Sequence, residues 1–230
     1  MINGFSFART TNANKKIENY FFSDSYNYSS IQMNLKHFFF GWQHLFLISS
    51  GFQTGDMLVI GDWNDSPHGS FTNLMWAKPD GTRVLIAPSK ELGDFVSSLY
   101  SFEEVIVSAM EIERTKNSIE VNCDLGRVFM QWGMNLPLLF SRPRWFIANI
   151  EAPFARLFFG TKTHGTTRNG RKEWYHVRGI SRMKSVEMEL EGRSSNQMTG
   201  MSPSACFGFS NPPKMPLSVR VDSHIAAAES

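Results

Sequence analysis

The residues best suited to chemistry gather in the loop from Asp62 to His68. This short stretch brings two carboxylates, Asp62 and Asp65, close in sequence to the imidazole of His68. A carboxylate and an imidazole whose side chains meet can act as general acid and base, so these three residues are the candidate catalytic group of a metal-independent enzyme. The alternative is an ordinary polar turn, in which Asp and Asn side chains hydrogen-bond to the backbone at the surface.

A second polar group surrounds a predicted β-hairpin. The pair Asn169-Gly170 is a strong signal for a tight turn, because both residues accept positive φ angles. If that turn closes tightly, His164 and His176 fall at similar heights on neighbouring strands, about 5 Å apart when directly opposed. Glu173 lies three residues before His176 and therefore on the opposite face of a flat strand, which argues against a metal site. No metal is expected.

Large aromatic side chains and the histidines of this hairpin are the candidates for contact with a ligand. The chain is rich in Phe, Met and Trp, with 20, 12 and 6 residues, more than a minimal core requires. The candidate ligand-binding residues are Trp63, Trp76, His164, Trp174, Tyr175 and His176. A small apolar or amphipathic molecule in a β-barrel-like interior is the leading functional hypothesis.

Basic residues form a third group around residues 142–172. They are Arg142, Arg144, Arg156, Lys162, Arg168, Arg171 and Lys172. Together with nearby Phe and Trp residues they are able to contact an anionic lipid surface or a phosphate group, which makes a peripheral membrane or interaction protein another hypothesis. Solvated charges beside a core helix are the simpler interpretation.

Composition limits these alternatives. Over the whole chain, 23 Lys and Arg residues nearly balance 21 Asp and Glu residues, so no nucleic-acid partner is expected. No apolar run reaches the roughly 18 residues of a membrane-spanning helix, so no transmembrane segment is expected. The distant Cys123 and Cys206 favour two reduced thiols and a cytoplasmic protein over a disulfide. Glycine-rich phosphate-binding motifs are absent from the sequence, and no cofactor is expected.

The elements that position these residues begin, in our interpretation, at residue 56. Residues 1–55 are rich in aromatic residues, Asn and Ser and show no persistent period. They are expected to form an irregular arm, with a poorly ordered extension or a short targeting signal starting at Met33 as alternatives. Residues 56–221 are expected to form one β-rich domain, and residues 222–230 a tail.

Hairpin turns and alternating apolar residues predict the fold of that domain. Pro79 and Gly81 indicate a tight turn between two apolar runs, and residues 118–125 alternate as a half-buried strand does. Ser89 followed by an apolar stripe predicts a helix up to Tyr100, and a second helix is predicted over residues 143–158. The expected fold is α+β and mainly antiparallel: a curved sheet, barrel or half-barrel of about eight or nine strands with two helices packed on it.

Three segments carry a resemblance to a known family. The segment from Phe71 to Pro88, with Glu173 to Tyr175 and Cys206 to Pro213, resembles a family of uncharacterised bacterial proteins. The resemblance covers about residues 55–221 and implies a bacterial cytoplasmic protein of unassigned activity. It transfers no catalytic residue.

Overall fold

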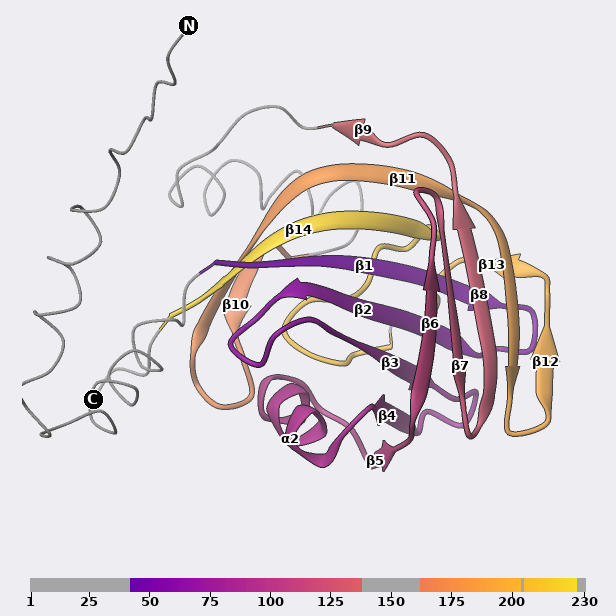
Figure 1. The fold of residues 1–230 in the computed structure, drawn as a ribbon, viewed down its shortest axis with the longest axis horizontal. Coiled ribbons are helices and arrows are strands. Elements are labelled where there is room, and N and C mark those ends of the chain that lie inside the picture. The colour runs from indigo at the N-terminus through magenta and orange to yellow at the C-terminus, as the bar shows by residue number, and fades with distance from the viewer. Residues whose placement is uncertain (1–41, 138–161, 204, 227–230) are drawn as a thin grey trace, which may run out of the picture. The chain divides into compact units, whose positions relative to one another are not determined.

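The protein is built around one strongly curled β-sheet that forms a half-barrel (Figure 1). The computed structural model describes residues 42–137, 162–203 and 205–226, and the structure below is that of these residues. Ten described strands follow one another in the order β5-β4-β3-β2-β1-β14-β11-β8-β7-β6. Only β4 and β5 are parallel among these neighbours, so the described sheet is mixed and predominantly antiparallel.

The strands of this path are β1 (Trp42–Phe52), β2 (Met57–Asp65), β3 (Phe71–Ala77), β4 (Arg83–Ala87), β5 (Glu104–Val107), β6 (Met110–Arg114), β7 (Ser118–Cys123), β8 (Gly126–Trp132), β11 (Lys172–Leu190) and β14 (Leu217–Ile225). Four short strands pair beside it: β9 (Leu136–Pro137), β10 (His164–Thr166), β12 (Arg193–Ser195) and β13 (Met198–Thr199). The path has ten strands, slightly more than the eight or nine expected. The four short strands beside it, of two or three residues each, are too short to show a period in sequence.

The long strand β11 allows the sheet to fold over itself. Its first part pairs with β14 and its second part with β8, and its register shifts between Val177 and Gly179 and again between Met183 and Ser185. Such irregularities bend a strand and increase its twist. Strands β6, β7 and β8 consequently fold back over the strands that begin the sheet (Figure 1).

Two apolar cores result, one on each face of the first half of the sheet. The core between the two halves contains Ile48, Leu58, Ile60, Leu74, Trp76 and Val84 from one half and Val121, Val128, Met130, Val186 and Met188 from the other. The core on the opposite face contains residues of β1–β4, the helix α2 and the segment from Met201 to Phe207. Most of the half-barrel interior is therefore filled by side chains.

One helix, α2 (Lys90–Leu99), is present among the described residues and confirms the helix predicted after Ser89. The Ser89 side chain caps it by accepting a hydrogen bond from the backbone N–H of Leu92, and Phe95, Val96 and Leu99 bury its apolar stripe. The second predicted helix, over residues 143–158, lies outside the described residues.

The predicted turns are also present. Gly81 has φ +91° and donates a backbone hydrogen bond to Lys78, closing the turn between β3 and β4. Gly170 has φ +80° and donates to Thr167 in the turn between β10 and β11. Both glycines adopt the left-handed conformation that side chains with a Cβ disfavour.

The sheet extends beyond both of the boundaries expected from sequence. Strand β1 lies inside the expected arm 1–55, where it pairs with β2 on one side and β14 on the other. Strand β14 continues through Ile225 and so includes the start of the expected tail. Leu45 of β1 is buried in one core and Ile48 in the other, so this strand has no polar face and no period of two in hydropathy.

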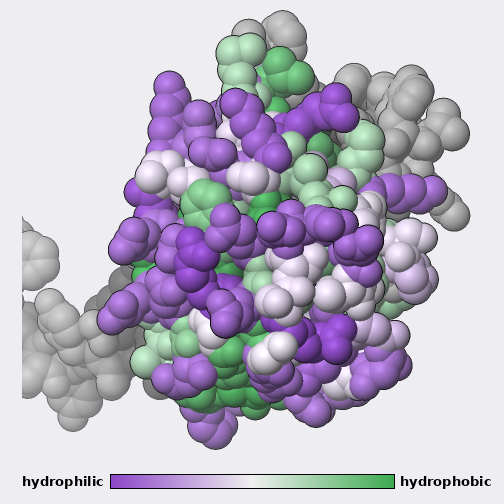
Figure 2. Space-filling view, turned by 90° about the vertical axis from the view of Figure 1, so that its right-hand side faces the viewer, coloured by the Kyte–Doolittle hydropathy of each residue, from purple (hydrophilic) through white to green (hydrophobic). Residues whose placement is uncertain are grey.

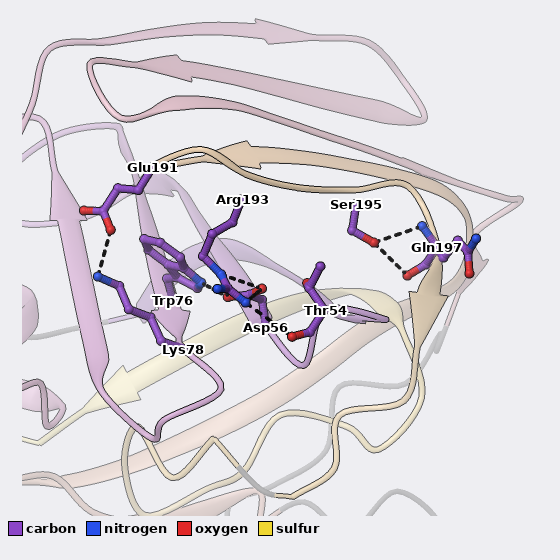
Figure 3. A network of polar contacts seen from close by, with 8 residues as sticks. All are labelled: Thr54, Asp56, Trp76, Lys78, Glu191, Arg193, Ser195 and Gln197. Atoms are coloured by element: carbon purple, nitrogen blue, oxygen red, sulfur yellow. Dashed lines mark hydrogen bonds and ion pairs between the residues drawn. The ribbon is translucent and has the colours of Figure 1, made fainter.

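A buried ion pair joins the start of β2 to β12. Asp56 has no exposed surface and accepts hydrogen bonds from the Arg193 guanidinium and, at 2.9 Å, from the Trp76 indole N–H. Figure 3 shows both groups pointing at the carboxylate, and Lys78 forms a further ion pair with Glu191 beside them. Hydrophilic residues cover most of the molecular face at the right of Figure 1, as Figure 2 shows. The hydrogen bonds and ion pairs around Asp56 therefore link the two halves of the sheet.

Candidate functional site

The structure does not bring the predicted acid–base residues together. Asp62 lies two residues after Ile60 and therefore on the same face of β2, the face toward β6. There it forms an ion pair with Arg114 and accepts a 2.7 Å hydrogen bond from the Thr72 hydroxyl. His68 contacts Glu91 of α2 at 3.0 Å, and its ring lies 4.6 Å from that of Phe95 in the opposite core.

Asp62 and His68 thus have different partners on opposite faces of the sheet, and Asp65 is exposed at the end of β2. The strand continues through Asp65, so alternation along it, rather than a compact loop, decides where each side chain points. Geometry gives these three residues no common site.

Trp63 of β2 and Trp76 of β3, both predicted to bind a ligand, are core residues. The Trp63 indole donates a 2.9 Å hydrogen bond to the Asn73 side chain and its ring stacks on Phe71. Trp76 belongs to the other core, where its indole donates to Asp56. Neither residue lines the cavity described below.

The hairpin places its histidines differently from the expectation. His164 is exposed and lies opposite Trp174, whereas His176 lies two residues further along β11. His176 is buried and lies opposite Asp222 of β14. The Trp174 ring meets that of His224, with 5.8 Å between centroids. Tyr175 alone among the predicted ligand-binding residues reaches the cavity.

A buried polar cluster lies on the face of the sheet that carries Tyr175. Glu173 has no exposed surface; it accepts hydrogen bonds from the Ser223 hydroxyl at 2.7 Å and from the Tyr100 hydroxyl at 3.3 Å. The Tyr100 hydroxyl also lies 2.8 Å from the Tyr175 hydroxyl. Glu173 and Tyr175 are two residues apart on β11 and so share a face, while Tyr100 follows the last residue of α2.

Burial controls the proton affinity of this cluster. Desolvation raises the pKa of Glu173 to about 7, and hydrogen bonds from Ser223, Tyr100 and Tyr175 offset only part of that effect. Burial, followed by the charge of Glu173, also raises the pKa of Tyr100 and Tyr175 well above the usual value. The carboxyl group therefore titrates near neutral pH, whereas both tyrosines stay protonated and able to donate hydrogen bonds.

Gln43 lies opposite Ser223 in the sheet and is buried, yet neither polar atom of its side chain has a hydrogen-bond partner among the residues that the structure describes. An unpaired buried polar group costs about 1–3 kcal/mol. Replacing Gln43 with Met, which has similar length and no such atoms, is expected to stabilise the fold by about 1 kcal/mol in urea unfolding. Asn122→Met, at a half-buried position in β7, is the control; equal stability of Gln43→Met and the wild type would contradict this account.

Beside the two tyrosines lies an apolar cavity of about 110 Å³. Side chains of β1–β3, β11 and β14 form one side of it, and the segment from Phe207 to Pro213 forms another. The lining residues are Leu47, Ser49, Val59, Met75, Tyr100, Lys162, Thr163, Tyr175, Val177, Phe207, Ser210, Asn211, Pro212, Pro213 and Val219. The exposed Lys162 marks the open side.

Close packing fixes the segment that covers the cavity. The Phe209 ring stacks on Tyr175 with 5.4 Å between centroids. Gly208 lies so close to Tyr100 that a Cβ would come within 2.8 Å of the Tyr100 ring, so only glycine fits without a shift. The segments Glu173 to Tyr175 and Cys206 to Pro213, quoted for the family resemblance, therefore meet at this cavity.

No protein-family model and no curated protein matches this sequence. The resemblance to a bacterial family thus depends on the residues quoted for it. Cys123 and Cys206 are not joined in a disulfide. In the described part of the chain, no three His, Cys, Asp or Glu side chains are grouped as metal ligands would be, and no helix is long and apolar enough to cross a membrane.

Sequence reasoning missed Tyr100, Ser223 and the role of Glu173. The sequence pattern predicts Tyr100 only as the end of a helix and Ser223 as part of the tail. One signal was available: Glu173 is a carboxylate on the same strand face as Tyr175, at a position where the strand is otherwise apolar or aromatic. Its burial depends on β14 and α2, which local sequence does not reveal.

Proposed function

We propose that this protein binds a small amphipathic ligand whose apolar part enters the cavity beside Tyr100 and Tyr175. The observation that carries the proposal is the cavity itself, an unfilled apolar space next to an otherwise packed core. Ligand sites in proteins are typically apolar hollows with a few placed polar groups. Tyr100, Tyr175 and Lys162 are such groups in this lining.

The volume of the cavity limits the ligand. About 110 Å³ is below the roughly 300 Å³ of a pocket for a drug-sized molecule and below the roughly 150 Å³ of a cavity that holds benzene. Only a short alkyl chain or a comparably small group fits inside. The remainder of the ligand extends past Lys162, whose ammonium group favours an anionic end such as a carboxylate.

A series of saturated fatty acids tests this proposal. From butanoate to hexanoate to octanoate, the Kd measured by calorimetry is expected to fall about fourfold per buried CH2, since each contributes about 0.8 kcal/mol. The improvement stops once the cavity is full. Lys162→Gln weakens the acids by at most about fivefold and leaves the matching alcohols unchanged. An affinity independent of chain length would contradict binding in the cavity.

A second candidate function is proton transfer in the same cavity. Glu173, with a pKa of about 7, hydrogen-bonds to Tyr100, whose side chain also lines the cavity. A general acid–base group is most effective when its pKa is close to the working pH. This enzymatic alternative replaces the Asp62–His68 pair, and its test is a bell-shaped or sigmoidal rate profile that Glu173→Gln abolishes.

The resemblance to a family of bacterial proteins, carried by the three segments quoted for it, supports a bacterial cytoplasmic protein. Fractionation of cells expressing the full-length chain tests the location. Recovery with the membrane or outside the cytoplasm would oppose it.

A further inference from the structure

A larger cleft lies at the end of the packed core between the two halves of the sheet. Its volume is about 540 Å³, within the range of about 300–1,000 Å³ typical of small-molecule sites. It lies on the opposite side of β1, β11 and β14 from the apolar cavity. The residues that line it are Phe46, Lys116, Asn117, Trp132, Met134, Asn135, Gly179, Ser181, Lys184, Ser218 and Arg220.

The charged side chains among the described lining residues are all positive. Lys116, Lys184 and Arg220 are exposed cations, and no carboxylate is among the described residues that line the cleft. None of the three forms an ion pair with any residue that the structure describes. Elsewhere in the described structure, Arg83, Arg114 and Arg193 each pair with a carboxylate. The cleft thus keeps its positive charge available for an anion.

Two buried hydroxyls provide further donors. Ser181 and Ser218 lie directly opposite each other on β11 and β14, and their exposed fractions are 4% and 3%. Neither hydroxyl hydrogen-bonds to a described residue. Arg220 lies two residues after Ser218 on β14 and therefore on the same face of the sheet. Its side chain and the two serine hydroxyls are thus directed to one region of the cleft. The Asn135 amide lies against Gly179, where a Cβ would come within 2.3 Å of its oxygen.

The remaining wall is apolar. Phe46 lies opposite Arg220 on the neighbouring strand, and Trp132 is 8% exposed at the end of β8. Aromatic faces of this kind pack against a flat organic group while nearby cations hold its charged end. We propose that the cleft binds a phosphate monoester, with the phosphate at Arg220, Lys184 and the two serines and an organic group against Phe46 and Trp132.

Phosphate suits this donor set better than a carboxylate does. A phosphate monoester carries a charge of about −1.5 to −2 near pH 7 and three acceptor oxygens. The two cations and two hydroxyls assigned to the phosphate match its charge and its three acceptor oxygens more closely than they match the single charge and two oxygens of a carboxylate. The phosphate belongs either to a soluble metabolite or to a lipid headgroup, and both sources share this chemistry.

Calorimetric titration with phenyl phosphate, inorganic phosphate and benzyl alcohol tests the site. Phenyl phosphate is expected to bind at least tenfold more tightly than inorganic phosphate, and benzyl alcohol is expected to show no binding. Arg220→Gln and Lys184→Gln should each weaken phenyl phosphate at least tenfold, because a hydrogen bond to a charged group contributes about 1.5–3 kcal/mol. Lys172→Gln, which removes an exposed cation far along β11, is the matched control.

Ser181→Ala and Ser218→Ala, which change little volume, keep the test valid if a charge variant fails to fold; each should weaken phenyl phosphate several-fold. Equal losses in Lys172→Gln, or no loss in any cleft variant with either phenyl phosphate or vesicles, would overturn the proposal. Co-sedimentation with vesicles containing phosphatidic acid distinguishes the sources. If Arg220→Gln weakens binding of the protein to the vesicles but phenyl phosphate does not bind, the phosphate belongs to a lipid headgroup. If phenyl phosphate binds and Arg220→Gln weakens it, the phosphate belongs to a soluble ligand.

Discussion

Replacing Asp56 with alanine is expected to destabilise the fold by about 3 kcal/mol. The Asp56 carboxylate is fully buried, and its removal leaves the Trp76 indole N–H and the partly buried Arg193 guanidinium without their partner. Breaking a buried ion pair typically costs about 3–5 kcal/mol, and the 38% exposure of the Arg193 side chain places this pair at the lower end. Urea unfolding at pH 7 measures the difference.

A control variant and the pH dependence of stability test whether the loss comes from the buried Asp56 carboxylate. Asp65→Ala, at an exposed position at the end of β2, the strand that follows Asp56, should change stability by less than about 0.5 kcal/mol. Burial raises the pKa of Asp56, but hydrogen bonds from Arg193, Thr54 and Trp76 outweigh it and hold the pKa below 3.8. The contribution of Asp56 is therefore present above that pH and lost as the pH falls through the lower folded-state pKa. A loss below 1 kcal/mol at pH 7 would contradict the network in Figure 3.

Glu173→Gln is expected to change how stability depends on pH. The pKa of Glu173 is raised from 4.5 to about 7 in the folded protein, so the folded state holds this proton more tightly than the unfolded state. Its contribution is fully present below pH 4.5 and is lost as the pH rises to about 7. The wild type should lose about 3 kcal/mol across that interval through this group, since each pKa unit corresponds to about 1.4 kcal/mol.

The Gln variant lacks this titration, so its stability curve should be flatter between pH 4.5 and 7, and it should be the more stable protein at pH 8. Urea unfolding at half-unit steps from pH 4 to pH 8.5 measures both curves. Glu189→Gln, on the exposed face of the same strand, is the control and should follow the wild type. Parallel curves for Glu173→Gln and the wild type would show that burial does not hold the proton on Glu173.

Turns and the capped helix were predictable because their signals are local. Gly81 and Gly170 occupy positions that require positive φ, and Ser89 caps α2 from the adjacent residue. Strand β1 was not predictable in this way. It is central in the sheet and buried on both faces, so its sequence has no alternation to distinguish it from an aromatic arm.

Candidate sites were less predictable than turns, because they depend on pairing between distant strands. Asp62 and His68 are close in sequence, but β2 and the following turn send them to opposite cores. Tyr100, Glu173 and Ser223 are far apart in sequence and meet only because β11 pairs with β14 and α2 packs on the same face. Of the predicted ligand-binding residues, Tyr175 lies at the resulting cavity.

The most direct test of ligand binding fills the cavity. Val177 lines it from β11 and is only partly buried, so Val177→Phe is expected to occupy the space without preventing folding. Val107→Phe, at a position 52% exposed on β5, is the matched control. Calorimetry with octanoate should show binding to the wild type and Val107→Phe and at least tenfold weaker binding to Val177→Phe. Equal octanoate affinity in all three proteins would contradict the cavity as the ligand site.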